Sequence, residues 1–66
     1  MNITLNGDPR QIDNGLTVEA LLLSLSLNPK KVAVERNREI VSKSTFEKVM
    51  LEEGDQLEIV HFIGGG

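Results

Sequence analysis

The chain has 66 residues, with ten acidic and seven basic side chains, a formal charge of −3 and no cysteine. A chain this short forms one small core with little room for an internal cleft, so we expect a single domain over residues 1–66. The lack of cysteine excludes disulfides and thiolate chemistry, and fits a reducing, cytoplasmic setting. The charge disfavours nucleic acid as a partner and favours a partner protein that has a basic docking surface. No stretch approaches membrane-spanning length, so we expect no membrane partner.

Two strands joined by a tight turn are predicted at the start of the chain. Ile3 and Leu5 alternate with polar residues, as in a half-buried strand. Asn6-Gly7 supplies the positive backbone dihedrals that a two-residue hairpin turn requires. The second arm is expected to run through residues 11–12, with Pro9 near its beginning, where a missing N–H does least harm.

A helix is predicted from Val18 to about Leu25. The Thr17 hydroxyl can cap its first turn, and Glu19 places a negative charge there. Asn28-Pro29 is expected to stop it, because the residue before proline avoids helical geometry. Three leucines share one face of this helix and should cover a sheet: Leu21, Leu22 and Leu25.

The second half of the chain predicts three more strands. Residues 32–34 alternate in polarity, the polar run ERNRE follows, and Ile40 and Val41 come next, which indicates a hairpin. The segment SKSTFEKV could hold one short helical turn anchored by Phe46. Gly54 marks a sharp turn, and the last strand begins at residues 57–59.

This order of elements predicts an α+β fold in which one main helix packs across one face of a mixed, four- to five-stranded sheet. If the first strand pairs with the last, the final residues leave from the end of a strand inside the sheet. We expect residues 63–66 to form a flexible C-terminal tail, because glycine loses more backbone freedom on ordering than any other residue.

Residues that usually carry catalysis are scarce. His61, the only histidine, falls in step with Leu57 and Ile59, so we expect a partly packed strand residue rather than a catalytic base. Glu52, Glu53 and Asp55 flank Gly54 and are interpreted as a solvated turn, since their spacing lacks the alternating ligands of a calcium loop. The sequence predicts no catalytic residue and no metal site.

Apolar residues accumulate on both faces of the last strand near its end. Val60 and Phe62 share the parity of Glu58, so a face that begins polar turns apolar toward the C-terminus. Local packing is one explanation. The other is a docking surface for a partner, formed by Val60, Phe62 and Ile63 beside the tail.

The chain finishes with Gly64, Gly65 and Gly66. A terminal carboxylate is ionised at neutral pH and is a poor electrophile, so it must be activated, for example as a mixed anhydride with AMP, before it can carry a group. An enzyme reaches such an anhydride most easily when side chains do not obstruct the approach, which glycine permits. Glycine-rich ends are also common as simple flexible slack.

Four segments together carry a resemblance over the whole chain: MNITLNG, LTVEALLLSL, KKVAVERNREIVSKSTFE and LEEGDQLEIVHFIGGG. They resemble the ThiS family, the bacterial sulfur carrier proteins of thiamine biosynthesis. The resemblance implies the ubiquitin-like β-grasp fold. It also implies that an E1-like enzyme uses ATP to adenylate the carboxylate of Gly66, which is then converted to a thiocarboxylate by a sulfur-donating enzyme and delivers its sulfur to thiazole synthase.

On this interpretation the chain is a protein co-substrate and not an enzyme, and it binds no cofactor of its own. Gly65 and Gly64 would give the partner's active site access to Gly66. Two alternatives stay open. The small sulfur carrier subunit of molybdopterin synthase shares the fold and the Gly-Gly end but is usually longer, and a β-grasp interaction module would bind partners without using its carboxylate.

Overall fold

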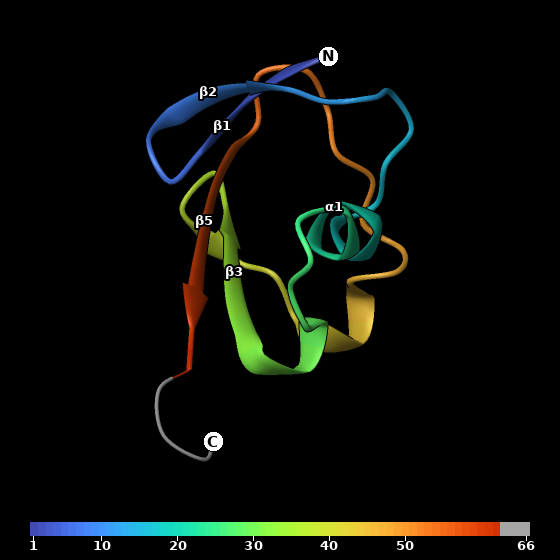
Figure 1. Cartoon of the computed structure of the whole chain (residues 1–66), viewed down its shortest axis with the longest axis vertical. Helices are drawn as coiled ribbons and strands as arrows, with labels where there is room; N and C mark the ends of the chain where they lie inside the picture. The colour runs from blue at the N-terminus through green and yellow to red at the C-terminus, as the bar shows by residue number, and fades with distance from the viewer. Residues whose placement is uncertain (63–66) are drawn as a thin grey trace.

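The computed structural model describes residues 1–62. They form a five-stranded mixed sheet with one α-helix, α1 (Val18–Ser24), packed across one face (Figure 1). The α+β prediction is thereby confirmed. The predicted tail 63–66, with Ile63 of the docking prediction and the three glycines, lies outside the described residues. The sheet is built from β1 (Asn2–Leu5), β2 (Asp8–Gln11), β3 (Val32–Arg36), β4 (Glu39–Ile40) and β5 (Gln56–His61).

The first two strands form the predicted hairpin. Asn6 and Gly7 connect them with φ angles of 49° and 85°, the left-handed conformation that this turn requires. β2 begins earlier than expected, at Asp8, and ends at Gln11. Pro9 lies within it, and the site tolerates proline because β2 is an edge strand of the sheet.

Helix α1 begins as predicted, with the Thr17 hydroxyl accepting a hydrogen bond from the Ala20 N–H at 3.1 Å. The expectation that Asn28-Pro29 stops it is wrong. The helix ends at Ser24 and the chain reverses at Ser26, whose φ of 61° closes a Schellman-type cap in which the Leu27 N–H donates to the Leu22 carbonyl oxygen. Asn28 instead caps a separate turn, η1 (Pro29–Lys31). No helix within residues 1–62 is long and apolar enough to cross a membrane.

The strands lie in the order β2-β1-β5-β3-β4, so the last strand along the chain is the central strand of the sheet. β5 runs parallel to β1 and antiparallel to β3, and the expected pairing of first and last strands is confirmed. The chain therefore approaches its C-terminal residues from the middle of the sheet, away from both edges.

The core lies between α1 and the sheet. Leu21 and Leu22 of the helix are buried against alternate residues of the central strands, and the third predicted leucine, Leu25, is only partly buried at the margin. Phe46 follows a second short turn, η2 (Lys43–Thr45), and is buried, as predicted. The remaining buried apolar side chains are those of Ile3, Leu5, Val18, Val32, Val34, Leu51, Leu57 and Ile59.

Candidate functional site

The end of strand β5 leads directly to the residues predicted to carry the chemistry. Its ladder with β3 runs to the pair of His61 and Val32, and the N–H of Phe62 continues it by donating to the Lys31 carbonyl oxygen at 3.0 Å. The backbone is therefore fixed against the sheet as far as Phe62. The predicted glycines follow outside the described residues.

Val60 and Phe62 are both exposed, at 61% and 51%. Local packing in the core therefore does not explain the apolar end of this strand, and a role in docking stays a prediction. A third exposed apolar residue was not predicted as part of this surface. Ile40 on the edge strand β4 is 80% exposed.

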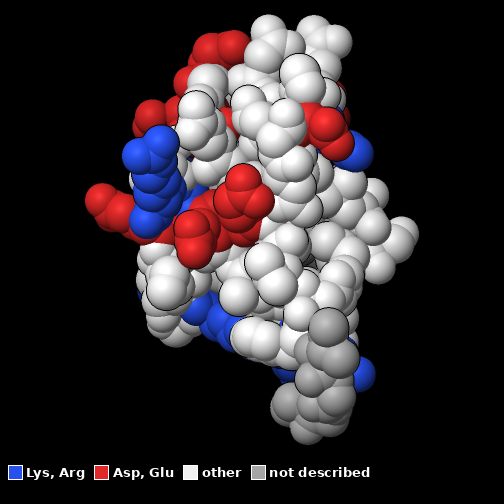
Figure 2. Space-filling model, turned by 90° about the vertical axis from the view of Figure 1, so that its left-hand side faces the viewer, with Lys and Arg blue, Asp and Glu red and all other residues white. Residues whose placement is uncertain are grey.

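The face of the sheet opposite α1, which we call the open face, brings acidic and apolar side chains together. Glu35 and Glu58 stand directly opposite each other on β3 and β5, and Ile40 stands opposite Glu35 on β4. Figure 2, which views the molecule from this side, shows acidic side chains gathered on the face. We define the open-face patch as Glu35, Ile40, Glu58 and Val60.

Two asparagine side chains position β5 by making hydrogen bonds to its backbone that a neighbouring strand would otherwise make. The Asn6 amide accepts from the Ile59 N–H at 2.7 Å and donates to the Ile59 carbonyl oxygen at 3.2 Å, which prolongs the short pairing of β1 with β5. At the start of β5, the Asn37 side-chain oxygen accepts from the Gln56 N–H at 2.9 Å. The central strand is thus held at its start and near its middle by side chains from turns.

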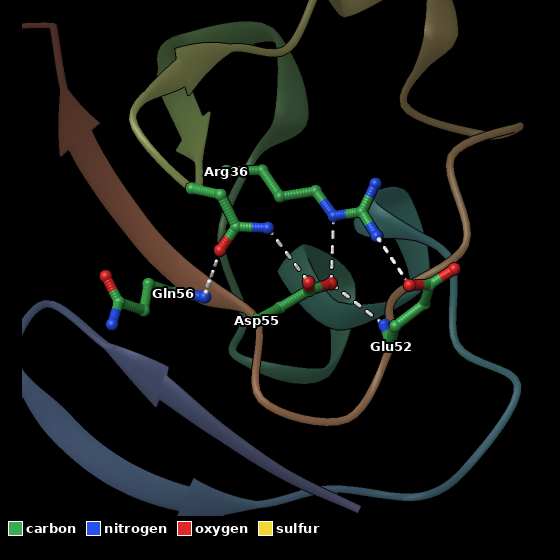
Figure 3. Close-up of polar contacts among 5 residues, drawn as sticks. Arg36, Glu52, Asp55 and Gln56 are labelled. Atoms are coloured by element: carbon green, nitrogen blue, oxygen red, sulfur yellow. Dashed lines mark hydrogen bonds and ion pairs between the residues drawn. The ribbon is translucent and has the colours of Figure 1, made fainter.

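Asp55 ties the turn before β5 to the turn after β3 (Figure 3). One carboxylate oxygen accepts from Arg36 Nε and from the Glu52 N–H, each at 2.8 Å, and the other accepts from the Asn37 amide at 3.1 Å. The residue is only 4% exposed. Arg36 also lies 3.8 Å from the carboxylate of Glu52, an exposed partner that adds little stability.

Burial by itself raises the pKa of the Asp55 carboxyl, because it disfavours the charged form. The hydrogen bonds from the Glu52 backbone, Arg36 and Asn37, with the positive charge of Arg36, outweigh this cost. They hold the pKa of Asp55 below its ordinary value. The carboxylate is therefore charged at neutral pH, and it serves the structure of the turn.

Two predictions about these residues need correction. Glu52 and Glu53 are exposed, as expected of a solvated turn, but Asp55 is buried because Arg36 and Asn37 satisfy its oxygens. His61 is exposed rather than partly packed, because β5 runs past the region that α1 covers (Figure 1). Among residues 1–62, no three potential ligands lie close enough to hold a metal ion.

The model of the ThiS family matches residues 3–66 of this chain. The chain belongs to the ThiS family. The match spans the helix, the central strand, the glycines and all of the hairpin except Asn2. The family prediction made from the four sequence segments is confirmed.

Relatives of known name support the same assignment to the ThiS family. The sulfur carrier protein ThiS of Bacillus subtilis is 50% identical over 50 residues, which cover 76% of each chain. A thiazole synthase of Magnetococcus marinus is 54% identical over all 66 residues, and the chain spans only 20% of the length of that protein. The crystal structure of the thiamine biosynthesis protein ThiS from Geobacter metallireducens is 36% identical, covers 100% of both chains and superposes with a TM-score of 0.86. This agreement confirms the ubiquitin-like β-grasp prediction.

Within this ThiS-family fold, sequence reasoning missed Arg36, Asn37 and Ile40. Asn37 and Arg38 have φ angles of 52° and 71°, so they form the tight turn between β3 and β4. An asparagine in a short polar turn is a signal for that conformation, but nothing local links it to Asp55, which is 18 residues away.

Proposed function

We propose that this chain is a sulfur carrier of thiamine biosynthesis that acts in the cytoplasm as a protein co-substrate and not as an enzyme. The observation that carries the proposal is membership of the ThiS family over residues 3–66, glycines included. The names of the Bacillus subtilis and Geobacter metallireducens relatives favour the thiamine pathway over molybdopterin synthesis. The proposal requires a free carboxylate on Gly66.

The chemistry proposed for Gly66 is activation followed by exchange of oxygen for sulfur. A carboxylate oxygen attacks the α-phosphorus of ATP in an E1-like enzyme, pyrophosphate leaves, and an acyl-adenylate forms. Hydrosulfide supplied by a sulfur-donating enzyme then attacks the acyl carbon, the bond from carbon to the AMP oxygen breaks, and AMP leaves. The C-terminal thiocarboxylate that results would supply the sulfur of the thiazole ring.

Gly64 and Gly65 suit this role because the reacting carbon must enter the active site of another protein. A chain without side chains passes through a narrower channel and adopts dihedrals closed to other residues. Within the described residues, hydrogen bonds fix β5 on both sides, so the fold presents a rigid base for the residues that follow. ATP is bound by the partner, and this chain needs no cofactor of its own.

The partners proposed are the E1-like adenylating enzyme, the sulfur-donating enzyme and thiazole synthase. The Magnetococcus marinus thiazole synthase holds a region 54% identical to this chain within one much longer polypeptide. Covalent linkage raises the effective concentration of two domains for each other, which suits a carrier and its acceptor. This supports thiazole synthase as the acceptor of the sulfur.

The open-face patch and Phe62 are proposed as the docking surface. Glu35 and Glu58 repel each other when they stand opposite on neighbouring strands, and basic groups of a partner would relieve that repulsion. Val60 and Ile40 supply exposed apolar area beside the acidic pair. The surface therefore fits a partner with an apolar centre and a basic rim.

Replacing Val60 or Phe62 with lysine is expected to weaken binding to the E1-like enzyme by about 2 kcal/mol, because each change removes apolar contact and adds a positive charge that a basic partner repels. Leu23→Lys is the matched control, since Leu23 is 58% exposed on α1 and lies outside the patch. Calorimetry measures the affinities. Equal losses for Val60→Lys and Leu23→Lys would contradict this docking surface.

The function itself is tested by complementation. A bacterial strain lacking its own ThiS-family protein should regain growth without thiamine when it expresses this chain together with its natural adenylating partner. A strain lacking the small subunit of molybdopterin synthase should not regain molybdenum cofactor. The reverse pattern would assign the chain to the molybdopterin pathway instead.

A further inference from the structure

We propose that Lys43 is a positioning residue that clamps Phe62 and so sets the point and direction in which the chain leaves strand β5. The consequence for catalysis by the partner rests on the proposed function. The clamp itself rests on three contacts among described residues. It joins η2, η1 and the end of β5, three segments that are separated along the sequence.

The contacts converge on the Lys43 ammonium group. Its Nζ atom donates a hydrogen bond to the Lys30 carbonyl oxygen at 2.8 Å and lies 4.4 Å from the centroid of the Phe62 ring. The next carbonyl along η1, that of Lys31, accepts the Phe62 N–H at 3.0 Å. The ring and the backbone of Phe62 are thus held from two adjacent positions of the same turn.

The distance to the ring lies within the range of a cation–π interaction, in which an ammonium group is attracted to the electron-rich face of an aromatic ring. Within residues 1–62, Lys43 forms no ion pair with a carboxylate. Its charge is therefore directed to a carbonyl oxygen and an aromatic ring. These two groups determine where the side chain lies.

The clamp would matter because ordering side chains and backbone at an interface costs free energy that docking must supply. Phe62 is half exposed, so without the Lys43 contact its ring would sample several orientations and its backbone hydrogen bond to Lys31 would open more often. With the contact, Phe62 has a fixed position and orientation at the point from which the chain enters the partner's active site. Loss of Lys43 should therefore raise the KM of the adenylation reaction and change kcat little.

Three variants test the clamp. Lys43→Met removes the charge and the donor and keeps most of the length. Lys43→Arg keeps a cation that can stack on the ring and donate hydrogen bonds. Lys31→Met is the matched control, because Lys31 is an exposed neighbour with the same charge, and this change leaves its carbonyl oxygen in place.

The first measurement needs no partner. Amide hydrogen exchange at Phe62 should quicken roughly 3- to 10-fold in Lys43→Met, from the loss of one cation–π contact and one hydrogen bond, while core amides such as that of Val34 keep their rates. Lys43→Arg should restore slow exchange. Unchanged exchange in Lys43→Met, or equal acceleration in Lys31→Met, would overturn the clamp.

The second measurement is steady-state adenylation by the E1-like enzyme, followed as pyrophosphate release. We expect KM to rise roughly 3- to 10-fold in Lys43→Met with kcat nearly unchanged, and Lys43→Arg to recover the original KM. Equal KM values for Lys43→Met and the original chain would overturn the catalytic consequence. If the original chain is not adenylated at all, the proposed function fails, and the exchange result still decides the clamp.

Discussion

Replacing Asp55 with alanine is expected to lower the free energy of unfolding by roughly 3 kcal/mol, because one buried carboxylate satisfies the Glu52 N–H, Arg36 and Asn37 together. Without it, these three donors lose their acceptor and the turn before β5 loses its link to the turn after β3. Denaturant titration at neutral pH measures the loss. Glu52→Ala is the control and should change stability by less than about 1 kcal/mol, because the Glu52 side chain is 78% exposed.

The stabilisation by Asp55 should also depend on pH. The folded state holds the pKa of this carboxyl below 3.8, its ordinary value. A group with a lowered folded-state pKa stabilises the fold above the unfolded-state pKa and loses that contribution as the pH falls through the folded-state pKa. The difference in stability between the original chain and Asp55→Ala should therefore shrink in acid below about pH 4. A difference that stays constant from neutral pH into that range would contradict this account.

Asp55→Asn separates charge from shape. The asparagine oxygen can still accept from Arg36 and the Glu52 N–H, but its NH₂ group then faces the NH₂ group of Asn37. Asn37 cannot turn its amide round without breaking its bond to the Gln56 N–H. We expect this variant to be destabilised, with a difference from Asp55→Ala that depends little on pH.

Gly65→Val is expected to abolish adenylation by the E1-like enzyme. Valine is branched at Cβ, which restricts its own backbone and adds bulk one residue before the reacting carboxylate. Extending the chain beyond Gly66 should have the same effect, because no carboxylate then exists at that position. Pyrophosphate release with ATP and the partner enzyme measures both.

Gly65→Ala is the graded control and should retain more activity than Gly65→Val, because its side chain is smaller and unbranched. Both variants should unfold at the same denaturant concentration as the original chain, since the core residues described run from Ile3 to Ile59. Undiminished adenylation of Gly65→Val would contradict the access role proposed for Gly65, whereas absence of adenylation in the original chain would favour a non-covalent interaction module.

Local signals predicted most of this fold. The alternation at Ile3 and Leu5, the turn at Asn6-Gly7 and the cap at Thr17 each depend on neighbours along the chain, and each has the predicted role. The helix ends within one residue of the predicted Leu25, but the predicted stop signal at Asn28-Pro29 was wrong, because Ser26 ends the helix by adopting a left-handed conformation. Serine is not among the residues that favour this conformation.

The errors at the candidate site arose from contacts between distant residues. Asp55 lies in an acidic run typical of a solvated turn, and only the approach of Arg36, 19 residues earlier, makes its burial favourable. His61 has the same parity as the buried residues Leu57 and Ile59, but parity does not show how far along β5 the helix covers the sheet. Val60 and Phe62 share the parity of Glu58, and that pattern already indicated an exposed face. Ile40 lies on the same face because β4 pairs with β3, which the local sequence does not indicate.

The central claim is that Gly66 carries sulfur, and the mass of the chain tests it most directly. Incubation with the E1-like enzyme, ATP and a sulfur-donating enzyme should increase the mass by the difference between one sulfur and one oxygen atom. Fragmentation should place that increase on the last residue, and addition of thiazole synthase with its other substrates should remove it. An unchanged mass with an active adenylating enzyme, or sulfur found elsewhere in the chain, would contradict the account.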